Sequence, residues 1–128
     1  MPRVLIIDDE KMIRNMLRQA LQRKGHVVLE APDGAEGIRL HKEKPFDVIV
    51  VDIVMPEKEG IETILELKKN DPGVKLIAIS GYGGFEPRSY LDTAKKFGVE
   101  VTFAKPFNIT EFMDAVESLI GEKKNSSE

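Results

Sequence analysis

Short apolar runs alternate with longer amphipathic segments along the whole chain. The runs predict five β-strands, because they are rich in β-branched residues and are bounded by turn or acidic residues. The predicted strands are Val4–Ile7, Val27–Leu29, Val48–Val51, Leu76–Ile79 and Val99–Ala104. Several of these runs are apolar at every position, which is typical of strands that are covered on both faces.

The segments between the strands predict helices, since their apolar residues recur every three or four positions. The apolar faces lie in 11–24, in a weaker helix from Asp33-Gly34 toward Lys44, at 61, 64 and 65, at 91, 94 and 97, and at 112, 116, 119 and 120. Gly25, Asp71 and Gly98 predict the ends of the first, third and fourth helices. Asn108 and Glu111 predict a capping box at the start of the last helix.

Five strand–helix units predict an α/β fold with a doubly wound parallel sheet and helices on both faces. Right-handed crossovers place the carboxyl ends of all strands on one edge, where open sheets of this type bind ligands. We expect one domain over residues 1–121. A short polar tail, 122–128, is expected to be frayed, with no output domain after it.

Composition narrows the function classes. The chain has 128 residues, no cysteine and a net charge of −3, so disulfides and thiolate metal sites are excluded and direct nucleic-acid binding is not expected. The apolar run near the N-terminus has only four residues, too short for a signal peptide or a membrane span. We therefore expect a cytoplasmic protein that does not act at a membrane.

Polar residues follow the predicted strands at the edge where ligands are expected. The first strand is followed by Asp8 and Asp9, the third by Asp52, the fourth by Ser80 and the fifth by Lys105. Each residue has an ordinary structural role on its own, such as capping a helix or forming a turn. The whole set is not expected by chance. Adjacent carboxylates repel each other and are costly to bury, so another group must offset that cost.

These residues stand in stretches that resemble the response-regulator receiver domain, the CheY-like phospho-acceptor module of two-component signalling. The matching stretches, in the family's order and spacing within residues 3–120, are VLIIDDE, VIVVDIVMPEKEG, LIAISG and FAKPF. The resemblance implies a flavodoxin-like sheet with strand order 2-1-3-4-5. That order comes from the resemblance and not from the pattern of residues.

The resemblance implies that Asp52 accepts a phosphoryl group to form an aspartyl phosphate. A carboxylate that attacks an anion beside other carboxylates needs a divalent cation, Mg²⁺ or Mn²⁺, to offset the charge. The implied metal ligands are Asp9 directly, Asp8 partly through water, Asp52, and the backbone carbonyl of Val54. Lys105 would neutralise the phosphoryl oxygens, and a cis peptide bond before Pro106 would aim its amine inward.

The resemblance also implies a switch. Ser80 would donate a hydrogen bond to the phosphoryl group, and Gly81 would leave the entry open. The family carries an aromatic residue three positions before the lysine, where this chain has Thr102. Neighbouring strand residues point to opposite faces, so Phe103 is expected in the core and cannot replace that aromatic residue.

The glycine-rich stretch GYGGFEP, residues 81–87, is expected to be a flexible connection. The alternative is a mobile lid in which Tyr82 or Phe85 contacts a partner. Tyr82 lies two residues past Ser80, where the family controls the access of water. We hypothesise that Tyr82 and Val54 slow hydrolysis of the phosphoryl group by excluding water.

Two further groups of residues have simpler interpretations. His26 and His41 lie outside the strand-end set, so neither is expected to carry a phosphoryl group. The basic residues of the first helix are expected to be solvated, and they would border a surface where family kinases dock. These residues are Arg14, Arg18, Arg23 and Lys24.

The leading interpretation is a receiver that takes phosphoryl groups from a sensor histidine kinase or a histidine phosphotransfer protein and acts on a downstream protein target. It would catalyse only its own phosphorylation and dephosphorylation. A binding module without phosphorylation is disfavoured, because Asp9, Asp52 and Lys105 are all present. A flavin protein is disfavoured because the acids after the first strand would repel a flavin phosphate. An aspartate-nucleophile phosphatase would need a second acid where Val54 stands.

Overall fold

The computed structural model describes residues 2–53, 59–80 and 87–126, and it describes the side chains of all of these except 59, 87–91 and 122–126. The strands are β1 (Arg3–Ile7), β2 (Val27–Ala31), β3 (Val48–Asp52), β4 (Lys75–Ser80) and β5 (Val101–Ala104). The helices are α1 (Lys11–Arg23), α2 (Gly34–Glu43), α3 (Glu59–Asn70), α4 (Pro87–Lys96) and α5 (Ile109–Ser126).

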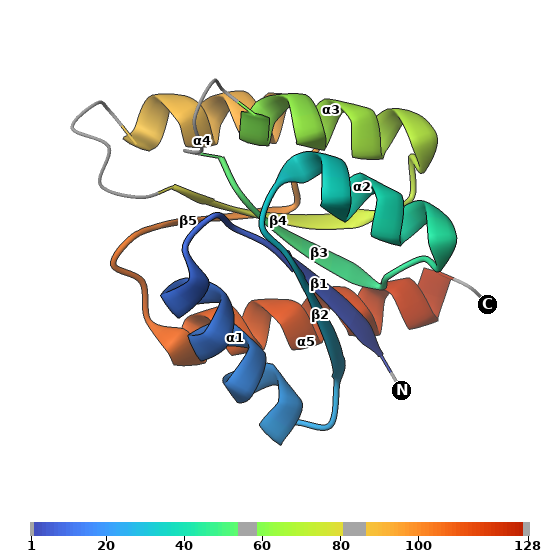
Figure 1. Cartoon of the computed structure of the whole chain (residues 1–128), viewed down its shortest axis with the longest axis vertical. Coiled ribbons are helices and arrows are strands. Elements are labelled where there is room, and N and C mark those ends of the chain that lie inside the picture. The colour runs from blue at the N-terminus through green and yellow to red at the C-terminus, as the bar shows by residue number, and fades with distance from the viewer. Residues whose placement is uncertain (1, 54–58, 81–86, 127–128) are drawn as a thin grey trace.

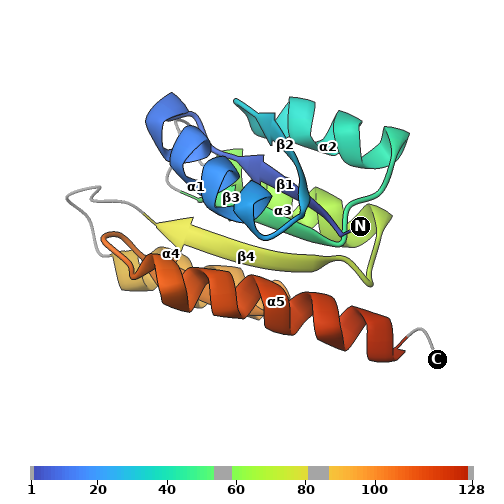
Figure 2. The ribbon, with the colours of Figure 1, turned by 90° about the horizontal axis from the view of Figure 1, so that it is seen from below.

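The strands form one parallel sheet in the order β2-β1-β3-β4-β5, which confirms the predicted fold (Figure 1). Helices α1 and α5 cover one face, and α2, α3 and α4 cover the other (Figures 1 and 2). Two buried apolar clusters, one on each face of the sheet, fill the space between the layers. A sheet covered on both sides explains why β1, β3 and β4 are apolar at nearly every position.

Side chains alternate between the two faces of the sheet along each strand, so successive residues belong to different clusters. In β1, Leu5 and Ile7 face α2 and α3, whereas Val4 and Ile6 face α1 and α5. The same alternation packs the partly buried Phe103 of β5 against the cluster with α5, and the centroid of its ring lies 6.0 Å from that of Phe112. The prediction that Phe103 belongs to the core is therefore confirmed.

Two boundaries differ from the predicted ones. Strand β5 begins at Val101 and not at Val99, because the amide of Val99 donates to the carbonyl of Ala94 and closes the last turn of α4. Gly98, at φ 95°, makes that turn possible. Helix α5 continues to Ser126, five residues beyond the predicted end of the last helix at Gly121. The sequence Glu-Lys-Lys after Gly121 has good helix propensity, which allows the helix to extend.

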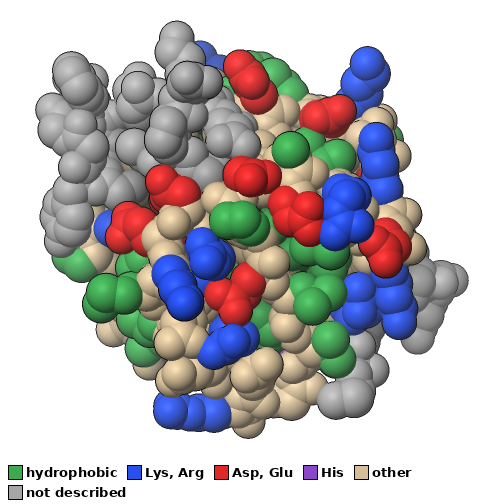
Figure 3. All heavy atoms as spheres, viewed as in Figure 1, with side chains coloured by type: hydrophobic (Ala, Val, Ile, Leu, Met, Phe, Trp, Pro, Cys, Tyr) green, Lys and Arg blue, Asp and Glu red, His purple; other side chains and the backbone are tan. Residues whose placement is uncertain are grey.

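The predicted helix starts are largely confirmed. The side chain of Asn108 accepts hydrogen bonds from the amides of Thr110 and Glu111, as an N-cap does. Over the described surface in Figure 3, acidic and basic side chains are interspersed, as the mixed composition predicts. Within the described ranges, no helix is long and apolar enough to cross a membrane.

Candidate functional site

The carboxyl ends of the strands bring the predicted polar residues together at one edge of the sheet. Asp8 follows β1, Asp52 ends the adjacent β3, and Lys105 follows β5. The Nζ atom of Lys105 lies 3.5 Å from Oδ2 of Asp8 and 3.5 Å from Oδ2 of Asp52. It also lies 3.6 Å from Oε1 of Glu10. One ammonium group therefore stands among three carboxylates.

Lys105 is held in place by the backbone as well as by charge. Its amide donates to the carbonyl of Ser80 over 2.8 Å, and its peptide bond to Pro106 is cis, as predicted. The side chain is only 9% exposed. Burial alone would lower the pKa of the Lys105 ammonium, but the charges of Asp52, Asp8 and Glu10 outweigh it and raise that pKa. Lys105 is therefore positively charged at neutral pH.

Asp8 is almost fully buried, with 2% of its surface exposed. Its Oδ1 accepts a hydrogen bond of 2.8 Å from the amide of Glu10, whereas Oδ2 has no hydrogen-bond partner among the described residues. Burial raises the pKa of the Asp8 carboxyl, and the Glu10 amide and the charge of Lys105 oppose that rise only in part. The charged form of Asp8 is therefore costly without another cation.

Four carboxylates approach one another closely enough to share an ion. One oxygen from each of Asp8, Asp9, Glu10 and Asp52 lies within 4.8 Å of the others. Asp8 and Asp52 are buried, and Asp9 and Glu10 are exposed, so the cluster opens to solvent on one side. Hard carboxylate oxygens, one of them buried without a hydrogen bond, suit a hard divalent cation such as Mg²⁺. The residues present therefore fit the metal that the sequence predicts.

Ser80 ends β4 beside β3 and is fully buried. Its hydroxyl has no hydrogen-bond partner in the part of the chain that the structure describes. Thr102 pairs with Ala78, on the sheet face opposite Phe103. The predicted residues Val54, Gly81 and Tyr82 lie outside the described residues.

Two residues of this edge were missed by the sequence analysis. Glu10 joins the carboxylate cluster, although only its neighbours had been assigned as ligands. Gly60 lies in the first turn of α3, where an added Cβ would lie 2.3 Å from Cα of Ile53 and 2.6 Å from the carbonyl oxygen of Asp52. The absence of a side chain lets α3 approach the strand end that carries Asp52. Glu10 could have been found from the sequence, because it is the third acid in the run that follows β1. Gly60 could not, because a single glycine in the sequence does not indicate a close approach.

The prediction that the basic residues of α1 are solvated is wrong for Arg14. Arg14 and Arg18 both pair with Glu30 of β2, at 3.2 Å and 3.1 Å. Arg14 also donates to the carbonyl of Asp8 over 2.8 Å. The reason is that the edge strand β2 runs beside α1 and presents a carboxylate to it.

Both histidines are buried and lie outside the carboxylate cluster. His26 contacts Glu117 of α5 over 2.5 Å. His41 accepts a hydrogen bond from the amide of Phe46 and contacts Asp71 over 2.9 Å. These contacts join helices to neighbouring segments of the chain.

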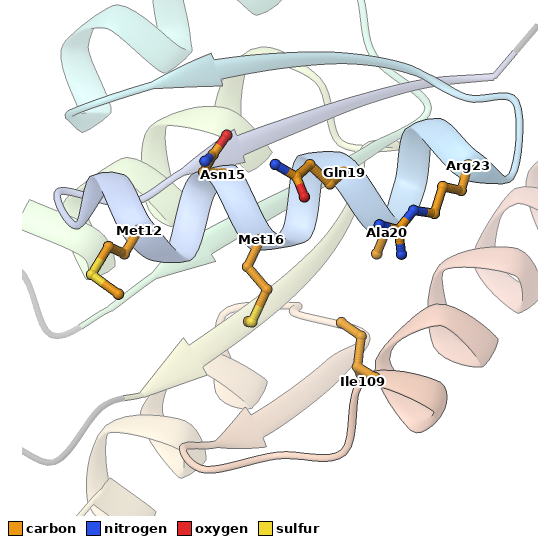
Figure 4. Close-up of a pocket in the computed structure, with 7 residues that line it drawn as sticks. All are labelled: Met12, Asn15, Met16, Gln19, Ala20, Arg23 and Ile109. Carbon is orange, nitrogen blue, oxygen red and sulfur yellow. The ribbon is translucent and has the colours of Figure 1, made fainter.

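The outer face of α1, next to the carboxylate cluster, carries exposed methionines. A groove of about 430 Å³ runs along α1 and is lined by Met12, Asn15, Met16, Gln19, Ala20, Arg23 and Ile109. Met12 is 84% exposed. Met16 points from α1 toward the start of α5, where Ile109 lies (Figure 4). This face is apolar along its middle and basic at its far end.

The sequence was compared with protein families and with known proteins. The family model described as the response regulator receiver domain matches residues 4–117. The chain is 34% identical over 117 residues to a chemotaxis protein CheY of Halobacterium salinarum, covering 91% of this chain and 95% of that protein. It is 31% identical over 124 residues to sporulation initiation phosphotransferase F of Bacillus subtilis, covering 96% and 97%.

The fold was also compared with solved structures. A response regulator receiver domain protein from Clostridium thermocellum superposes with a TM-score of 0.87 at 29% identity, covering 97% of this chain and 98% of that one. A CheY-like receiver domain protein from Methanospirillum hungatei JF-1 gives the same TM-score at 26% identity, with 98% of each chain covered.

Proposed function

Because the chain belongs to the response regulator receiver family, we propose that it accepts a phosphoryl group on Asp52 in a Mg²⁺-dependent reaction and signals through phosphorylation-dependent protein contacts. A histidine kinase or a histidine phosphotransfer protein is the donor. The chain catalyses only its own phosphorylation and dephosphorylation.

The observation that carries this proposal is the position of Lys105, 3.5 Å from both Asp52 and Asp8. Phosphoryl transfer depends mainly on positioning and on neutralising negative charge. A carboxylate oxygen of Asp52 forms a bond to phosphorus while the bond from phosphorus to the donor nitrogen breaks, and the donor keeps that electron pair. The ammonium group of Lys105 stands where it can contact an oxygen of the transferred group.

Asp9, Asp52 and the carbonyl of Val54 would hold Mg²⁺, or Mn²⁺ in its place, with Asp8 acting partly through water. Bound there, the ion neutralises the carboxylates and the phosphoryl oxygens. Glu10 adds a further carboxylate at the exposed side of the cluster. Support comes from the buried Oδ2 of Asp8, which lacks a hydrogen-bond partner among the described residues.

Ser80 and the segment after it form the response to phosphorylation in this proposal. The buried hydroxyl of Ser80 is drawn toward Asp52 and donates to a phosphoryl oxygen. Thr102 stands where the family carries an aromatic residue, so the change passes through Ser80 and Lys105 and not through an aromatic rotamer. Tyr82 and Val54 limit the access of water to the phosphoryl group.

The groove on α1 is the surface proposed for the phosphoryl donor. The groove begins at Met12, two residues along the chain from Glu10 of the carboxylate cluster. Exposed methionines adapt to apolar partner surfaces, and Arg23 at the far end suits an acidic group on the donor. Such a donor would present its phosphohistidine to Asp52.

Phosphorylation by acetyl phosphate tests the proposal directly. The protein is incubated with acetyl phosphate and Mg²⁺ and is then weighed by intact mass spectrometry. We expect the mass gain of one phosphoryl group in the wild type and in the matched control Asp114→Asn, an exposed site on α5, but not in Asp52→Asn. A wild type without the gain would favour a binding module that keeps the fold without this chemistry. A gain that survives in Asp52→Asn would refute Asp52 as the acceptor.

A further inference from the structure

Arg14 joins three parts of the chain at the edge of the acidic site. Its Nη1 donates to the carbonyl oxygen of Asp8 over 2.8 Å, and its Nε donates to Oε1 of Glu30 over 3.2 Å. The side chain is only 15% exposed. The planar guanidinium presents its donors in a rigid fork, so it holds both partners in one defined geometry.

Arg18, one turn later on α1, provides a natural comparison. It donates to Oε2 of Glu30 over 3.1 Å and also contacts Asn15. Within the described part of the chain, Arg18 makes no hydrogen bond to Asp8. The two arginines therefore share the same carboxylate partner and the same charge, but only Arg14 reaches the acidic site.

Asp8 is held at three points around its backbone and side chain. Its amide donates to the carbonyl of Ala31 over 3.1 Å, its carbonyl accepts from Arg14, and its carboxylate accepts from the amide of Glu10. The carbonyl of Asp8 belongs to the peptide group that leads into Asp9. Fixing this carbonyl therefore fixes the direction in which both acids leave the end of β1.

We propose that Arg14 is a positioning residue for the acidic site, and that Glu30 holds Arg14 in the geometry that this role requires. The inference rests on the proposed function, since it concerns the affinity of the site for Mg²⁺. Arg14 acts on the backbone of Asp8 and does not touch its carboxylate. Groups that orient metal ligands in this way change metal affinity by about 10–100-fold when they are removed.

The test compares Arg14→Gln with Arg18→Gln, which remove the same charge and the same kind of contact to Glu30. Urea unfolding is followed by circular dichroism at increasing Mg²⁺ concentration, and the dependence of stability on Mg²⁺ gives the dissociation constant. We expect Arg14→Gln to weaken Mg²⁺ binding about tenfold. Arg18→Gln should bind Mg²⁺ within about twofold of the wild type, because Arg18 contacts Glu30 and Asn15 at a distance from Asp8.

A third variant separates positioning from the packing of α1 on β2. Glu30→Gln loosens Arg14 but leaves the contact to Asp8 possible, so its loss of Mg²⁺ affinity should be smaller than that of Arg14→Gln. Equal affinity in Arg14→Gln and Arg18→Gln, or a larger loss in Glu30→Gln, would overturn the inference. If the wild type itself gains no stability from Mg²⁺, the proposed function fails first, so the two failures are distinguishable.

Discussion

Replacing Asp8 by Asn should stabilise the protein in the absence of divalent ions while removing its response to Mg²⁺. Asn has nearly the same shape, and its Oδ1 can still accept the hydrogen bond from the amide of Glu10. The substitution therefore removes one negative charge from the acidic site and leaves the turn after β1 intact.

The size of the effect follows from the charges around Asp8. The site holds four carboxylates and one ammonium group, a net charge of −3. Two unit charges 4.8 Å apart repel by about 1 kcal/mol in water and by about 3 kcal/mol at an effective dielectric constant of ~20. The attraction of Lys105 for Asp8 roughly offsets the repulsion from Asp52. Repulsion from Asp9 and Glu10 and the cost of burial remain, so we expect a gain of about 1–3 kcal/mol.

The gain should depend on pH in a defined direction. The pKa of Asp8 in the folded state is raised above its ordinary value of 3.8, so the folded protein binds this proton more tightly than the unfolded chain does. Below pH 3.8 the carboxyl is neutral in both states, and the wild type and Asp8→Asn should be equally stable. The advantage of Asp8→Asn should develop as the pH rises from 3.8 through the folded pKa, and it should stay constant above it.

Urea unfolding in EDTA, from pH 3 to pH 8, measures the difference in stability between Asp8→Asn and the wild type. The same unfolding experiments with Mg²⁺ measure how much stability each protein gains from the ion. Asp9→Asn is the matched control, because Asp9 is exposed and its substitution should affect Mg²⁺ more than stability in EDTA. An Asp8→Asn variant that is less stable than the wild type at pH 7 without metal would refute the reasoning. So would a gain that is the same at pH 3 and pH 7.

Three further predictions concern neighbouring residues. Gly60→Ala should lower the free energy of unfolding by about 1–3 kcal/mol and slow phosphorylation, because its Cβ would lie 2.3 Å from Cα of Ile53; normal urea stability would contradict this. Lys105→Gln should cost about 1–3 kcal/mol in EDTA at pH 7 by leaving buried carboxylates without their cation. The pKa of Lys105 is raised above 10.5, so its contribution to the free energy of unfolding is fully present below pH 10.5 and is lost as the pH rises through the folded pKa. If Lys105→Gln unfolds at the same urea concentration as the wild type, Lys105 does not stabilise the fold in this way. Tyr82→Ala should shorten the lifetime of the phosphoryl group on Asp52, measured as phosphate release with Mg²⁺, whereas an unchanged lifetime would remove this residue from the control of water access.

The sequence alone determined the strands, the fold class and most of the acidic site. The apolar runs of β1, β3 and β4 were readable because strands that are buried on both faces carry few polar residues between their ends. Parallel strands end on one edge, so Asp8, Asp52 and Lys105 could be placed together from their positions after the strands. The order of the strands, in contrast, came from the family resemblance, since nothing in the runs themselves says which strands are neighbours.

The tertiary structure decided what depends on contacts between distant segments. Arg14 looked like a solvated residue of an exposed helix, but β2 lies beside α1 and presents Glu30 to it, 16 residues along the chain. Gly60 carried no signal in the sequence, but it stands where α3 approaches Asp52. Periodicity shows which face of an element is buried; it does not show which residue of another element meets that face. For that reason the acids could be found in the sequence, whereas the residues that hold them in place could be found only in the fold.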